Sequence, residues 1–146
     1  MLDGRVPASL QGDLDSFVAA IQQLPSGLRA MASIYQLDVS LALDDLGWHF
    51  ANWHHHGFAL ETSRGLRELG ADSLATLFDA AYAQATQYWS QLAAPGFVKW
   101  YRDSDLERGL EPLNEQMWAF CRQQGDLGLL ALWLAYARRH PTLLLE

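Results

Sequence analysis

The apolar residues of this chain recur every three or four positions from residue 13 onward. That spacing places them on one face of successive α-helices, because an α-helix turns once every 3.6 residues. No long stretch alternates apolar and polar residues as a half-buried strand would. The pattern predicts an all-α single domain, an irregular bundle of about five to seven helices. Glycine and proline positions divide it into predicted helices at residues 13–24, 28–53, 58–69, 72–92, 105–124 and 127–139.

Two segments fall outside this pattern. Residues 1–12 contain glycines and a proline but no apolar period, so they are predicted to form a loosely ordered arm ahead of a single helical domain at residues 13–146. Residues 97–104 are predicted to be a loop with one extended piece. Two residues that disfavour a helix interior also lie inside predicted helices. Gly47 is expected to mark close packing or a kink, and Pro112 a kink or the first turn of a second helix half.

The amino-acid composition is that of a globular domain and limits where the protein is expected to act. Half of the 146 residues are apolar, including six tryptophans, which is enough for the core of one domain. Cys121 is the only cysteine, so neither an internal disulfide nor a cysteine zinc cage can form, and a reducing, cytoplasmic location is expected. The stretch 127–137 is too short to span a membrane, and the net charge of −7 argues against direct nucleic-acid binding.

Three segments carry a family resemblance. They are 46–57 (Leu-Gly-Trp-His-Phe-Ala-Asn-Trp-His-His-His-Gly), 66–71 (Leu-Arg-Glu-Leu-Gly-Ala) and 134–141 (Leu-Ala-Tyr-Ala-Arg-Arg-His-Pro). In a bacterial family called domain of unknown function 4375, which includes a DNA-mimic protein, similar segments form the signature, a helix junction and the closing motif. The present chain diverges from that signature at Asp45, Leu46, Phe50 and His54. The resemblance implies an all-α fold and, from one relative, DNA mimicry.

One row of polar residues suggests metal chemistry. Asp45, His49, Asn52 and His56 share one helical face if the second helix continues to residue 56. A histidine and a carboxylate one turn apart can bind a divalent transition metal. Asp45, His49 and His56 are therefore candidate metal ligands. The alternative is an exposed polar face that ends in a histidine-rich turn.

Two further sets of residues are candidates for a protein-interaction surface. The first is the aromatic and histidine-rich turn. The second is an acidic run whose carboxylates could imitate phosphates, although Arg102 and Arg108 interrupt it. The turn contributes Trp48, Asn52, Trp53, His54, His55 and Phe58, and the acidic run contributes Asp103, Asp105, Glu107, Glu111 and Glu115.

The sequence contains no phosphate-binding loop, serine elbow or zinc-protease motif, so we expect a protein that is not an enzyme. We predict a cytoplasmic helical module that binds a protein partner, and an acidic DNA mimic is one form that such a module can take. It is expected to need no cofactor and to bind neither nucleic acid nor membrane. Two alternatives stay open: a metal-dependent protein that uses the histidine and aspartate row, and a small-molecule binder in a tryptophan-lined cleft. The pattern does not determine the oligomeric state.

Overall fold

The computed structural model describes residues 11–141 of the chain. Residues 11–141 contain no strand, which confirms the all-α prediction. Most of the predicted N-terminal arm lies outside the described residues, and its last two residues, Gln11 and Gly12, begin a helix. The helices are α1 (Gln11–Gln22), α2 (Ser26–Leu43), α3 (Leu46–Asn52), α4 (His56–Glu68), α5 (Asp72–Thr86), α6 (Trp89–Ala93), α7 (Phe97–Tyr101), α8 (Asp105–Gln123) and α9 (Leu130–Arg139), with a 3-10 turn, η2 (Gly125–Leu127), before α9.

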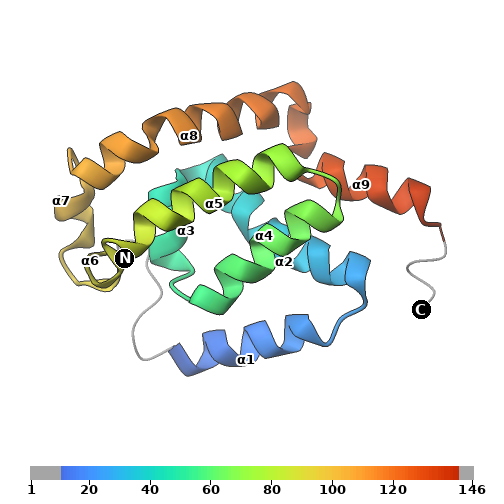
Figure 1. Ribbon diagram of the computed structural model, residues 1–146, viewed down its shortest axis with the longest axis horizontal. Helices are drawn as coiled ribbons and strands as arrows, with labels where there is room; N and C mark the ends of the chain where they lie inside the picture. The colour runs from blue at the N-terminus through green and yellow to red at the C-terminus, as the bar shows by residue number, and fades with distance from the viewer. Residues whose placement is uncertain (1–10, 142–146) are drawn as a thin grey trace.

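The helices form one bundle around a shared core (Figure 1). In that view α4 and α5 lie in the middle, α8 runs along one edge and α1 along the opposite edge. Side chains from α2 through α9 build the main core, whereas α1 packs through Val18 and Ile21 on a small separate cluster with Phe58. None of the helices within residues 11–141 combines the length and the apolar character needed to cross a membrane.

The predicted second helix is divided in two. α2 ends at Leu43, and α3 begins at Leu46 after an extended Asp45. The Asp45 carboxylate accepts a hydrogen bond from the backbone N–H of Trp48 at 2.9 Å, which caps the N-terminus of α3. The prediction of one helix to residue 53 is wrong, because an aspartate at this position stabilises a new helix start more than it stabilises continuation.

Three other expectations have clear outcomes. Residues 97–101 form the helix α7 and not an extended piece, because Phe97 and Tyr101 lie one turn apart, are both buried, and stack with ring centroids 5.1 Å apart. α8 continues through Pro112 without ending. Gly47 marks close packing, as expected, since a β-carbon there would collide with the Tyr101 ring.

Candidate functional site

Four carboxylates line a groove between α8 and the start of α3. We call this the acidic groove. On α8, residues 107, 111, 114, 115 and 118 face it at the spacing of one helical face. No lysine, arginine or histidine lines it. It is lined by Asp45, Glu107, Glu111, Asn114, Glu115 and Trp118.

Hydrogen bonds fix Asp45 and join the two walls of the acidic groove. Asp45 accepts from Trp48 and also from the Tyr101 hydroxyl, at 2.9 Å in each case. Asn114 Oδ1 accepts from the backbone N–H of Leu46 at 2.8 Å and thereby ties α3 to α8. Burial raises the pKa of Asp45, the Glu107 charge raises it further, and the bonds from Trp48 and Tyr101 oppose that rise. These bonds fix the Asp45 carboxylate and the contact between α3 and α8.

A second carboxylate stands beside Asp45. Partial burial, followed by the neighbouring charge of Asp45, raises the pKa of Asp44 to about 6. Burial and then the Asp45 charge also raise the pKa of Tyr101, so the tyrosine stays protonated and donates to Asp45. The edge of the acidic groove is consequently expected to lose negative charge as the pH falls through about 6.

The structure divides the predicted acidic run into two parts. At the start of α8, Ser104 caps Glu107 N–H at 3.0 Å, and Glu107 accepts from the backbone N–H of Asp103 at 2.7 Å. Arg108 pairs with the Asp105 carboxylate and donates to the backbone carbonyl of Asp103, so one of the two aspartates at this end of the run is neutralised. Glu111 and Glu115 are exposed, and no ion pair described within residues 11–141 involves either of them. Glu107, Glu111 and Glu115 join Asp45 in the groove, whereas Asp103 and Asp105 do not.

The row of candidate metal ligands is not brought together. His49 is buried, with its Nδ1 2.8 Å from Ser40 Oγ, and burial lowers its pKa to about 3. Asp45 points to Trp48 and Tyr101, and His56 lies at the start of α4 against Tyr82. The single helical face on which the metal hypothesis depended does not exist, because α3 ends at Asn52. Within residues 11–141, no three His, Cys, Asp or Glu side chains are placed to hold one metal ion.

The two remaining histidines of the turn fix neighbouring elements. His54 Nε2 lies 2.6 Å from the Trp89 carbonyl, and its ring stacks on that indole. His55 caps α4 by accepting from Phe58 N–H through Nδ1, at 3.1 Å. Its Nε2 therefore carries the proton and donates to Asp15 on α1, at 2.6 Å. These histidines hold α1, α4 and α6 in place.

Of the aromatic candidates of the turn, Phe58 is buried, whereas Trp48 and Trp53 are partly buried. Phe58 is 1% exposed, so its assignment to an interaction surface is wrong. Trp53 packs on Phe58, and Trp48 packs edge-on against Phe97. The Asn52 Oδ1 is buried and lacks a hydrogen-bond partner. Aromatic residues are common both at interfaces and in cores, so the sequence alone does not separate the two roles.

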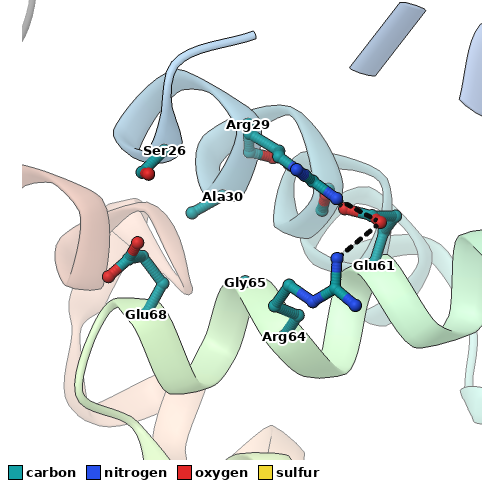
Figure 2. A pocket seen from close by; sticks show the side chains of 8 residues that line it. Ser26, Arg29, Ala30, Glu61, Arg64, Gly65 and Glu68 are labelled. Carbon is teal, nitrogen blue, oxygen red and sulfur yellow. Dashed lines mark hydrogen bonds and ion pairs between the residues drawn. The ribbon is translucent and has the colours of Figure 1, made fainter. Parts of the chain in front are cut away.

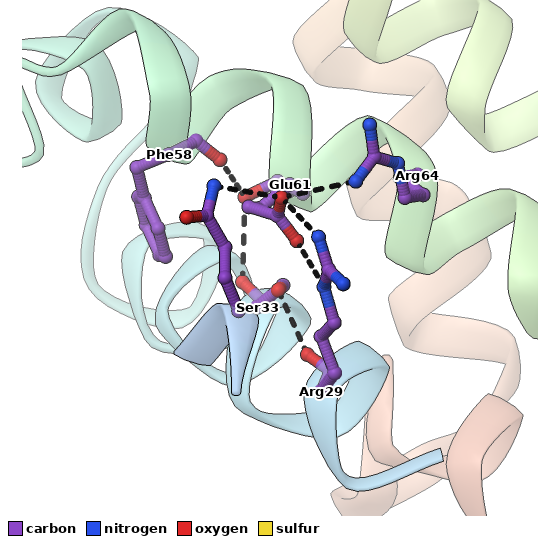
Figure 3. A network of polar contacts seen from close by, with 7 residues as sticks. Arg29, Ser33, Phe58, Glu61 and Arg64 are labelled. Atoms are coloured by element: carbon purple, nitrogen blue, oxygen red, sulfur yellow. Dashed lines mark hydrogen bonds and ion pairs between the residues drawn. The ribbon is translucent and has the colours of Figure 1, made fainter. Parts of the chain in front are cut away.

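A buried ion-pair network that sequence reasoning missed joins α1, α2 and α4 (Figure 3). Glu61 is 3% exposed and accepts two hydrogen bonds from Arg29, at 2.7 Å each. Gln22 donates to it at 3.3 Å and Arg64 at 3.2 Å. The bonds from Arg29 hold the pKa of Glu61 below its usual value, so the carboxylate stays ionised. Arg29 precedes Glu61 by 32 positions, so no local spacing connects the two.

A small hollow lies beside this network, between α2 and α4 (Figure 2). Its floor is formed where Gly65 approaches the backbone of Ala30, and Arg64 and Glu68 stand on its rim. The hollow holds two arginines and two glutamates, so its formal charge is balanced, and no tryptophan lines it. The alternative of a tryptophan-lined small-molecule cleft needs several tryptophans around one hollow. The acidic groove has one, Trp118, and a further hollow, which the three histidines of the turn line, also has one, Trp89.

Comparison with known proteins assigns the family. The model of the DMP19-like protein family matches residues 22–140. The resemblance to domain of unknown function 4375 is therefore wrong, because a differently named family matches most of the chain. The segments that suggested it are largely helix ends, which unrelated helical proteins share. No curated protein and no solved structure matches the chain.

Proposed function

The chain belongs to the DMP19-like protein family, and we propose that it is a protein-interaction module whose acidic groove binds a DNA-binding protein in place of DNA. The family is one of DNA-mimic proteins. The observation that carries the proposal is the acidic groove itself, which joins Glu107, Glu111, Glu115 and Asp45 without a basic side chain.

The spacing of these carboxylates supports the proposal. Glu107, Glu111 and Glu115 follow one another every four residues along α8. Four residues of α-helix rise about 6 Å. Phosphates of one DNA strand recur about every 3.4 Å along the duplex axis. Because the phosphates also wind around that axis, consecutive phosphates lie farther apart in space than this rise, and the carboxylate spacing along α8 is of the same order. Asp45 adds charge from the opposite wall of the groove.

Charge-neutralising substitutions test the groove. Immobilised protein is incubated with an extract of its source cells, and the retained proteins are compared between two double variants. The double variant Glu111→Gln with Glu115→Gln is expected not to retain a DNA-binding protein that the unchanged protein retains. The reason is that the two carboxylates that would contact the partner's basic residues are removed. Salt of about 0.5 M should release the same protein, because it screens exposed charges.

The matched control removes two exposed carboxylates elsewhere, at the junction of α4 and α5. Glu68→Gln with Asp72→Asn changes the net charge equally but leaves the acidic groove intact. This control should retain the partner. Equal retention by both double variants would show that the groove does not bind it.

A further inference from the structure

The hollow between α2 and α4 has its positive and negative side chains at opposite ends (Figure 2). Arg29 and Arg64 lie together at one end, where both bind the buried carboxylate of Glu61. Glu68 lies at the other end of the hollow. Two guanidinium groups share one ionised carboxylate at the first end, so that end keeps one positive charge, and Glu68 places one negative charge at the second end.

The two arginines use only part of their hydrogen-bonding capacity on Glu61. Arg29 donates through Nε and Nη2, and Arg64 donates through Nη1. Within residues 11–141 the structure describes no other side-chain hydrogen bond from either guanidinium, so Nη1 of Arg29 and Nη2 of Arg64 keep donors for a ligand. A guanidinium has five N–H donors in a planar arrangement that suits a carboxylate. The positive end can therefore bind a second carboxylate besides Glu61.

Glu68 is left without an ionic partner although an arginine precedes it by four residues. Arg64 and Glu68 lie one turn apart on α4, a spacing at which opposite charges commonly pair. Arg64 is directed at Glu61 instead, at 3.2 Å, and no ion pair in the described part of the chain involves Glu68. The exposed carboxylate of Glu68 is therefore able to accept hydrogen bonds from a cationic group in the hollow.

The size of the hollow limits the ligand to a few heavy atoms. Its volume is about 310 Å³, part of which is open to solvent. Pockets for small molecules range from roughly 300 to 1,000 Å³, so this one is at the lower end. The floor is closed, because a β-carbon on Gly65 would lie 3.2 Å from the Ala30 carbonyl oxygen. A ligand that contacts both ends must therefore be small and carry its two charges close together.

We propose that this hollow binds a small zwitterion, a free α-amino acid, with its carboxylate on Arg29 and Arg64 and its ammonium group on Glu68. The side chain of the amino acid points to the open mouth. A simple anion would lie near the unpaired charge of Glu68, and a simple cation would lie near the two arginines, so a molecule with both charges is favoured over either. The hollow shares no residue with the acidic groove, so the proposal is independent of the proposed function.

The test compares three small molecules of nearly equal size. L-Alanine carries both charges, L-lactate has a hydroxyl group in place of the ammonium group, and ethylamine lacks the carboxylate. Each is titrated into the full-length protein labelled with ¹⁵N, and the backbone amide signals of Ala30 and Gly65 are followed by NMR. L-Alanine is expected to shift them saturably with a Kd on the order of 1 mM. L-Lactate and ethylamine should bind at least about tenfold more weakly, because each lacks one charged contact.

Matched variants assign the two ends of the hollow. Glu68→Gln should weaken L-alanine about tenfold without weakening L-lactate, because only L-alanine has an ammonium group to lose its partner. Arg64→Gln should weaken L-alanine and L-lactate alike. Asp126→Asn, an exposed carboxylate in η2, is the control and should leave all three affinities unchanged.

Three results would overturn the proposal. They are no saturable shift with L-alanine, equal affinities for the three molecules, and equal effects of Glu68→Gln and Asp126→Asn. Glu68 and Asp126 are both exposed, so neither substitution should impair folding. The NMR spectrum of each variant without ligand shows directly whether it is folded.

Discussion

Replacing Glu61 with alanine is expected to lower the free energy of unfolding by about 3 kcal/mol, because it leaves a partly buried guanidinium without its charge partner. Arg29 directs two hydrogen bonds at this carboxylate, and Gln22 of α1 depends on it as well. Urea unfolding followed by circular dichroism measures the change.

Arg64→Ala provides the control. Arg64 also contacts Glu61 but is 65% exposed, so its loss should cost at most about 1 kcal/mol. Replacing both partners, as Arg29→Met with Glu61→Leu, should recover part of the stability, since no unpaired charge is left inside. A Glu61→Ala protein as stable as Arg64→Ala would show that the network in Figure 3 does not hold the three helices together.

The second large expected effect is a loss of folding stability as the pH falls. His49 has a pKa of about 3 in the folded protein because it is buried, against 6.5 in the unfolded chain. The unfolded chain therefore takes up a proton that folded His49 does not accept, and stability is lost as the pH falls from 6.5 toward 3. Between about pH 7 and pH 5 this loss amounts to about 2 kcal/mol.

His49→Leu isolates this contribution, because the substitution removes the titrating group from the core. Asp44 acts in the opposite direction, since its raised pKa favours the folded state as the pH falls, but it is present in both proteins. Glu61, with its lowered pKa, loses its contribution only at lower pH. The stability difference between the two proteins, measured by urea unfolding, should change by about 2 kcal/mol across this range. A constant difference would contradict a buried, neutral His49.

The helical class could be predicted from the sequence because apolar spacing is a local property. The division at Asp45 could not, because the apolar stripe continues from Leu43 before it to Leu46 and Phe50 after it. Only the capping bond to Trp48 distinguishes a new helix start from a helix interior. The metal hypothesis failed for the same reason, because it needed one unbroken helix from Asp45 to His56.

The candidate site was predicted in part for the same reason. Glu107, Glu111 and Glu115 follow a helical spacing, so their shared face was visible in the sequence. The other wall of the groove was not, because Asp45 comes from a segment about 60 residues earlier in the chain. The bond from Asn114 to Leu46 and that from Trp118 to the end of α2 join parts of the chain that no local pattern connects.

The central claim is that the acidic groove takes the place of DNA, and the most direct test is mutual exclusion. A DNA-binding protein retained by this chain is bound to fluorescently labelled duplex DNA, and the present protein is added while anisotropy is followed. Full displacement of the DNA, with the Glu111→Gln and Glu115→Gln double variant displacing it poorly, is the predicted result. A stable ternary complex, in which the partner keeps its DNA while bound to this protein, would contradict the account.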